Sequence, residues 1–252
     1  MTLASATPTR IQLCGSTAIE WRGERMEGRL PGRQGRLLFA YLVLNRHRMV
    51  GREELIDALW PRDLPTVGQT GLNPLISKLR RTFGPGVIEG RSTLRLQLGP
   101  DCVVDVEAAV AAAHRAESRV ALGEWKAAWG PSLVALFTAE REFLPGEDLP
   151  WVDQQRAELA DVRLRALEAY AAAALGTGGT ELPAAVRAGR KLVRLVPLRE
   201  TGYQVLMRAL AEQGNVAEAL VVYSSLCTVL RDELGVNPSG PTRALHRQLL
   251  GG

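Results

Sequence analysis

The stretch from Thr66 to Phe83 constrains the fold most, because it separates apolar from polar side chains at the period of a helix. At roughly 100° per residue, one side of the stretch is entirely apolar and the opposite side is polar apart from one proline. The apolar side consists of Leu72, Leu75, Ile76, Leu79 and Phe83, and the opposite side of Thr70, Asn73, Pro74, Ser77, Lys78, Arg80 and Arg81. This pattern predicts a helix with one face in a core and the other turned outward.

The outward side is cationic, and the sequence contains no acidic residue between Asp63 and Glu89. Arg, Lys, Asn, Ser and Thr are the side chains that contact base edges and phosphates. An exposed helix commonly mixes in acidic residues for solubility, and this one does not. We therefore expect nucleic acid to contact this side; the alternative is a basic exposed face without a partner.

The distribution of charge supports a polyanionic partner for the first part of the chain only. Residues 1–100 contain 15 Lys and Arg against 8 Asp and Glu, whereas residues 101–252 contain 16 against 19. A basic half beside a mildly acidic half favours a nucleic-acid contact in the basic half.

The elements predicted around this helix have a recognisable order. Alternation and turn residues predict strands at 10–13, 18–21 and 26–29, helices at 33–44 and 51–59, and a hairpin of 87–89 with 94–98. The hairpin follows a Gly-Pro-Gly stop at 84–86, and its tip carries Arg91, Ser92 and Thr93. This order is typical of a winged helix-turn-helix, in which the third helix enters the major groove and the wing reaches the backbone or the minor groove.

The chain from Asp105 onward is predicted to be helical. Asp105 suits the N-cap of a helix to Leu122, followed by a short helix at 124–129, an irregular stretch at 131–149 and a helix at 150–175. The last third repeats at 34 residues between Ala185 and Ala219, which indicates tetratricopeptide-like helical hairpins. We thus expect a mainly α protein with a winged helix-turn-helix (α+β) at 10–99 and an all-α tetratricopeptide-like domain at 100–252.

Several segments resemble the SARP family of actinobacterial transcriptional activators. In the first part they are residues 31–38, 54–61 and 76–81; in the second they are 105–106, 164–170, 197–200, 214–223 and 233–238. The resemblance implies a winged helix similar to that of response regulators, followed by a bacterial transcriptional activation domain. It also implies binding to double-stranded DNA at promoter repeats, side-by-side association on DNA, and contact with RNA polymerase.

The resemblance assigns roles to particular residues. It places Lys78, Arg80 and Arg81 in the recognition helix. The expected DNA-binding set is Thr70, Asn73, Ser77, Lys78, Arg80, Arg81, Arg91, Ser92 and Thr93. The loop implied to face polymerase is Trp60, Pro61, Arg62, Asp63, Leu64 and Pro65. Larger relatives append an ATPase domain, and the sequence has no GxxxxGK[ST] phosphate loop, so a small stand-alone member is expected.

Two features depart from the family pattern. Pro74 lies within the predicted recognition helix, where proline removes a backbone donor. Either the helix bends there, or residues 73–74 begin it and 66–72 form a preceding turn, which would remove Thr70 from the outward side. The second strand of the wing carries Leu94 and Leu96 where such wings often have an aromatic residue.

No motif predicts catalysis, a metal or a cofactor. The three histidines, His47, His114 and His246, are isolated, and the three cysteines lack metal or redox spacing. Without a secretory signal or a long apolar run, a cytoplasmic protein that does not cross a membrane is expected. Trp125, Trp129 and Phe137 are expected in the core, or else around a small-molecule pocket. The rival functions are a helical-repeat scaffold whose winged helix docks protein, and a repressor that uses the same DNA contacts.

Overall fold

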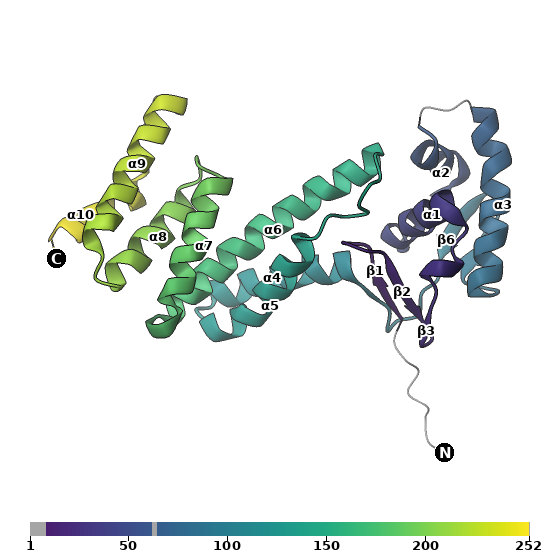
Figure 1. The fold of residues 1–252 in the computed structure, drawn as a ribbon, viewed down its shortest axis with the longest axis horizontal. Helices are drawn as coiled ribbons and strands as arrows, with labels where there is room; N and C mark the ends of the chain where they lie inside the picture. The colour runs from purple at the N-terminus through teal and green to yellow at the C-terminus, as the bar shows by residue number, and fades with distance from the viewer. Residues whose placement is uncertain (1–8, 62–64, 252) are drawn as a thin grey trace, which may run out of the picture. The chain divides into compact units, whose positions relative to one another are not determined.

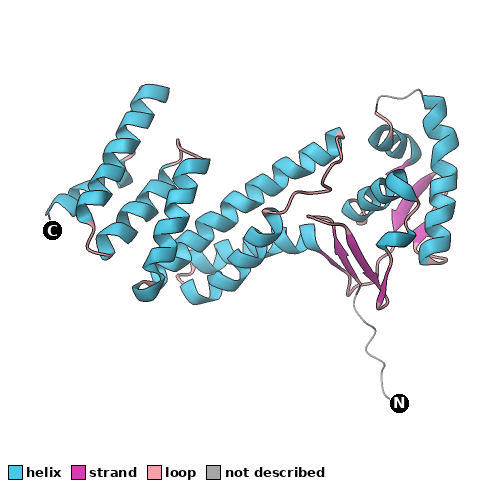
Figure 2. Ribbon diagram, in the orientation of Figure 1, coloured by secondary structure: helices cyan, strands magenta, loops and turns pink. Residues whose placement is uncertain are grey.

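The computed structural model describes residues 9–61 and 65–251, which form two compact units. One unit comprises the residues up to 108 together with 141–159, and the other comprises 109–140 and 160–252. Every strand of the described residues belongs to the first unit, and the second is built from helices (Figure 2). The mainly α fold class, with a winged helix followed by a helical domain, is confirmed. The boundary between residues 99 and 100 stays a prediction.

The first unit opens with a small sheet of strand order β3-β2-β1-β7. It consists of β1 (Arg10–Gln12), β2 (Ala18–Trp21), β3 (Glu24–Arg25) and β7 (Val103–Val104). Ile11 pairs with Ile19 in the antiparallel β1–β2 ladder and with Val104 in the parallel β1–β7 ladder. All three side chains are buried, so the alternating pattern of the sequence sets the inner face of this sheet.

The third strand, predicted near 26–29, begins two residues earlier as β3, and residues 27–29 form a 3-10 turn, η1 (Glu27–Arg29). The Glu27 carboxylate accepts the backbone N–H of Ile19 at 3.2 Å, and the Met26 N–H donates to the Ile19 carbonyl at 2.9 Å. These bonds turn the chain back onto β2 instead of extending it.

The winged helix-turn-helix has its three helices and its hairpin in the predicted order, and it also has a short strand between the first two helices that was not predicted. Its helices are α1 (Gly32–Leu44), α2 (Arg52–Leu59) and α3 (Pro65–Phe83), and its strands are β4 (Val50–Gly51), β5 (Ile88–Glu89) and β6 (Thr93–Leu96). The strands form a second sheet in the order β4-β6-β5, beside the three helices (Figure 1). Phe83 ends α3 stacked on Phe39 at 4.8 Å and edge-on to Trp21 at 5.6 Å, so aromatic packing fixes the end of the third helix.

Residues 141–159 join the first unit through backbone hydrogen bonds to the end of β1. The Leu144 N–H donates to the Leu13 carbonyl at 3.0 Å, and the Gly15 N–H donates to the Glu142 backbone carbonyl at 2.7 Å. Trp151 then donates from its indole nitrogen to the Ala58 carbonyl at 3.0 Å and meets the Tyr41 ring edge-on.

The second unit consists of helices that follow one another along the chain, and two of them, α4 (Asp105–Ala121) and α6 (Pro150–Thr177), begin in the first unit. The others are α5 (Trp125–Ala139), η2 (Gly179–Glu181), α7 (Leu182–Leu195), α8 (Glu200–Glu212), α9 (Val216–Leu234) and α10 (Gly240–Gly251). A Cβ on Gly189 of α7 would lie 3.0 Å from the Leu206 Cβ of α8. Ala185 and Ala219 are fully buried, so small residues let neighbouring helices approach closely, as the 34-residue spacing predicts (Figure 1).

The short helix at 124–129 and the irregular stretch after it are corrected by α5, which continues through Pro131 to Ala139. The Ser132 hydroxyl donates to the carbonyls of Ala128 at 2.9 Å and Trp129 at 2.8 Å, which supplies a donor next to the proline. Phe137 lies on the opposite side of this helix from buried Ala128, and the residue is 62% exposed. The expectation that Phe137 is a core residue is therefore wrong.

The other two aromatic residues of that group are partly buried. Trp129 meets Tyr170 edge-on at 4.9 Å within the core of the helical unit. The Trp125 ring occupies the space beside Gly176, where a Cβ would come within 2.3 Å of it.

In the part of the chain that the structure describes, no helix has the length and apolarity that a bilayer span requires.

Candidate nucleic-acid interface

The outward side of α3 is an exposed stripe, here called the outer stripe, made of Thr70, Asn73, Ser77, Lys78 and Arg81. On the opposite side Leu72, Ile76, Leu79 and Phe83 are buried. The helix is continuous through Pro74, so the alternative in which residues 66–72 form a preceding turn is wrong and Thr70 stays on the helix. The sequence thus places five polar side chains within about three turns of one rigid helix.

Arg80 is also on α3, but its guanidinium turns toward the wing. Its Nε donates to the Ile88 carbonyl at 3.1 Å and its Nη2 to the Gly90 carbonyl at 2.6 Å. Arg80 is half-buried, in contrast to the exposed Lys78 and Arg81. It therefore anchors the hairpin to the third helix, a role that helical periodicity alone does not separate from that of a base-contacting arginine.

Arg52, which the sequence reasoning missed, connects the outer stripe with the wing. Its Nη1 donates to the Arg91 carbonyl at 3.2 Å, and its Nη2 donates to the Asn73 side-chain oxygen. Arg52 is the first residue of α2, where the helix dipole favours acidic side chains over cations. A cation at that position is the one signal in the sequence that could have pointed to a role outside its own helix.

The wing is a tight hairpin between β5 and β6, with Arg91 and Ser92 exposed at its tip and Thr93 half-buried. Gly90 turns the chain at a φ of +92°, and a Cβ there would lie 1.9 Å from the Thr93 carbonyl oxygen. Leu94 and Leu96 of β6 are buried, so the positions that lack an aromatic residue contribute to the core.

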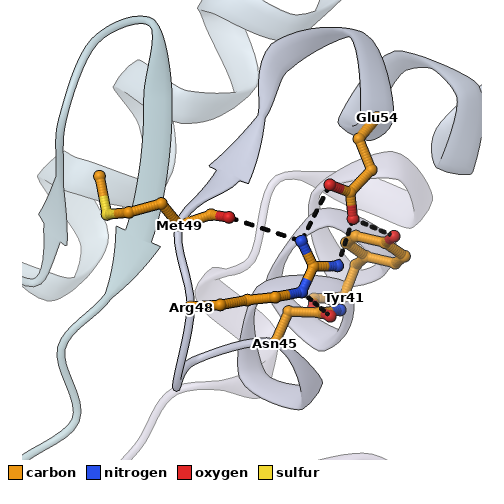
Figure 3. Close-up of polar contacts among 5 residues, drawn as sticks. All are labelled: Tyr41, Asn45, Arg48, Met49 and Glu54. Carbon is orange, nitrogen blue, oxygen red and sulfur yellow. Dashed lines mark hydrogen bonds and ion pairs between the residues drawn. The ribbon is translucent and has the colours of Figure 1, made fainter.

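A polar cluster fixes α2 against α1 (Figure 3). The Tyr41 hydroxyl donates to Glu54 at 2.7 Å, and the Arg48 guanidinium also pairs with that carboxylate, with one bond of 2.9 Å. Arg48 further donates to the Asn45 side-chain oxygen at 3.0 Å and to the Met49 carbonyl at 3.5 Å. These contacts orient the two helices that precede the outer stripe.

The cluster also changes proton affinities. Hydrogen bonding from Arg48 lowers the pKa of Glu54 below its ordinary 4.5, against the opposing effect of burial. Burial, followed by the bond to Glu54, raises the pKa of Tyr41 to about 12, so its hydroxyl remains a donor at neutral pH.

The predicted polymerase-facing loop is only partly described. Arg62, Asp63 and Leu64 lie outside the described residues. Pro65 is the first residue of α3, and the Trp60 ring lies against α3 at Gly71, where a Cβ would come within 3.1 Å of the indole. The glycine therefore makes room for Trp60 beside the third helix.

Comparisons with known proteins agree with this fold. Residues 104–250 match the family described as Bacterial transcriptional activator domain. The chain is 31% identical to Regulatory protein AfsR of Streptomyces griseus, over 98% of this chain and 25% of AfsR. It is 29% identical to Transcriptional regulatory protein EmbR of Mycobacterium tuberculosis, over 85% of this chain and 57% of EmbR. The chain thus spans about a quarter of AfsR and somewhat more than half of EmbR.

A solved structure resembles the chain over almost its whole length. Mycobacterium tuberculosis EmbR in complex with a low-affinity phosphopeptide superposes with a TM-score of 0.81 at 25% identity, over 97% of this chain and 65% of EmbR. The relatives named here are transcriptional regulators, and the chain shares the winged helix and the helical domain of EmbR. The chain belongs to the SARP family of regulators, whose members carry the bacterial transcriptional activator domain.

Proposed function

We propose that the chain is a sequence-specific DNA-binding activator of transcription. The observation that carries this proposal is the outer stripe: five exposed polar or cationic side chains on one helix whose other side is locked into a core. A helix of this width fits the major groove, and donors at such positions reach base edges and phosphates.

The contacts divide by position on the winged helix. Asn73, Ser77 and Arg81 face the base edges, and Lys78 and Thr70 lie beside them toward the phosphates. Arg91, Ser92 and Thr93 at the wing tip reach the backbone or the minor groove. Arg80 acts indirectly, because its guanidinium holds the carbonyls of Ile88 and Gly90 and so positions the wing.

Activation requires a second contact besides the one with DNA. We propose that RNA polymerase contacts the loop from Trp60 to Pro65 and the helical unit. We also propose that copies of the chain bind side by side on promoter repeats. The packing of Trp60 on Gly71 supports this assignment, since it would couple the loop to the helix that reads DNA.

Fluorescence anisotropy with duplexes from the region upstream of the gene tests DNA binding. The expected result is affinity for a repeat-containing duplex well above that for a scrambled duplex, falling steeply as salt rises because phosphate contacts release counterions. Equal affinity for both duplexes, or a flat salt response, would favour the protein-docking scaffold.

In vitro transcription from the same promoter tests the direction of regulation. An activator increases the transcript when the chain is added to purified polymerase. A decrease with the same binding site would make the chain a repressor.

A further inference from the structure

We propose that Arg52 sets the polarity of the Asn73 amide, so that the outer stripe presents a hydrogen-bond donor at this position. The base read by Asn73 is then guanine or thymine in preference to adenine, whose pairing with asparagine needs both ends of the amide. This inference rests on the proposed function and specifies one position of the recognised sequence.

The polarity follows from the chemistry of the contact. A guanidinium has only donors, so the atom of Asn73 that meets Arg52 Nη2 is the acceptor Oδ1 and not the amide nitrogen. The two ends of a side-chain amide point in different directions. With Oδ1 turned toward α2, the donor end Nδ2 is the end available to a base.

A donor and a full amide select different bases. Asparagine pairs with adenine by using both ends at once, its oxygen on N6–H and its nitrogen on N7. Engagement of Oδ1 by Arg52 competes with that pairing. A lone donor suits guanine, whose N7 and O6 both accept, or O4 of thymine; at adenine only N7 accepts, and it lies beside an amine that is itself a donor.

The second contact of Arg52 makes the arrangement rigid. Nη1 donates to the Arg91 carbonyl in the wing at 3.2 Å, while Nη2 contacts Asn73 on α3. A planar guanidinium held at two points has a defined orientation, which the single nitrogen of a lysine cannot reproduce. Arg52 is thus a positioning residue that acts through Asn73.

Selection of binding sites from a random duplex library tests this, with the full chain and its variants. The position of the binding site that Asn73 contacts is the one at which Asn73→Ala weakens the base preference. Wild type should prefer guanine or thymine there. Arg52→Lys should reduce that preference at least about fivefold, the low end of what a base contact contributes, and leave other positions unchanged.

Two further variants complete the design. Asn73→Asp replaces the donor by acceptors and should shift the same position toward cytosine or adenine, whose exocyclic amines donate. Arg187→Lys, an exposed arginine of α7 in the helical unit, is the matched control and should select the wild-type sequence. Circular dichroism melting of each variant checks the fold, and Asn73→Asp keeps the test valid if Arg52→Lys unfolds.

The outcomes distinguish failure of this inference from failure of the proposed function. Adenine at the position read by Asn73 in wild type, or an unchanged preference there in folded Arg52→Lys, overturns the inference and leaves DNA reading by α3 intact. Enrichment of no sequence by wild type overturns the proposed function, and the inference falls with it.

Discussion

The carboxylate of Asp105 accepts the backbone N–H of Leu13 at 2.9 Å, although 92 residues separate them in the sequence. Its second oxygen accepts the N–H of Cys14 at 2.9 Å, and the first also accepts that of Val106. Asp105 is the first residue of α4, so one side chain joins the start of a helix to the end of the first strand.

Replacement of Asp105 by alanine should therefore destabilise the first unit. Leu13 and Cys14 are fully buried, and their amides would lose their acceptor. At about 1–3 kcal/mol for each unpaired buried group, we expect the free energy of unfolding to fall by at least about 2 kcal/mol. Urea denaturation measures this, and Asp105→Asn, which keeps one acceptor oxygen, should lose less. Equal stability of wild type and Asp105→Ala would contradict the prediction.

Gly90→Ala should disable the wing. The backbone there has a φ of +92°, and the added Cβ would approach the Thr93 carbonyl oxygen to 1.9 Å. We expect a loss of about 1–3 kcal/mol in stability and a weaker affinity for the preferred duplex, because the displaced wing tip loses its contact with the DNA. Gly99→Ala, where the Cβ meets no atom within 4 Å, is the control for melting and anisotropy.

The stabilising effect of Glu54 should depend on pH. Its pKa is lower in the folded protein than its ordinary 4.5, so its contribution is present above that value and is lost as the pH falls through the folded pKa. Because the Glu54 side chain is about one-third exposed, we expect Glu54→Gln to cost no more than about 1 kcal/mol at pH 7.

Urea denaturation at pH 7 and at pH 3 measures the difference between wild type and Glu54→Gln, which should shrink at pH 3. The exposed neighbour Glu53 provides the control, and Glu53→Gln should show little difference at either pH. A Glu54→Gln effect that grows on acidification would contradict the assigned ion pair.

Substitutions of Arg81 and Arg80 should distinguish a residue that contacts DNA bases from one that positions the wing. Arg81→Ala should weaken binding to the preferred duplex by about 1–3 kcal/mol and leave the melting temperature unchanged, because its side chain is exposed. Arg80→Ala should lower the melting temperature as well, since two wing carbonyls lose their donor. Arg187→Ala serves as the control. Unchanged affinity of Arg81→Ala would remove it from the reading face.

The sequence predicts local structure better than contacts between distant segments. Periodicity and glycine stops locate α3 and the hairpin because those signals lie within a few residues of each other. The predicted helix at 124–129 is shorter than α5, which continues through Pro131, where the Ser132 hydroxyl bonds to neighbouring carbonyls. The link from Arg52 to Asn73 and Arg91 spans 21 and 39 residues, and no periodic pattern records it.

The same limit explains why Arg80 and Arg81 were assigned a common role. Their positions on the helical projection differ by only one step, and the hairpin that takes up Arg80 is placed by tertiary packing. Exposure in the folded chain, not residue type, divides the two arginines.

The parallel pairing of β7 with β1 limits how this protein can be dissected. A fragment cut after residue 99 would lack Val103, Val104 and Asp105, leaving one edge of β1 bare and the Leu13 and Cys14 amides without their acceptor. Such a piece would be prone to self-association through that open edge. A fragment meant to isolate the winged helix-turn-helix should therefore retain the beginning of α4 and the segment from 141 to 159.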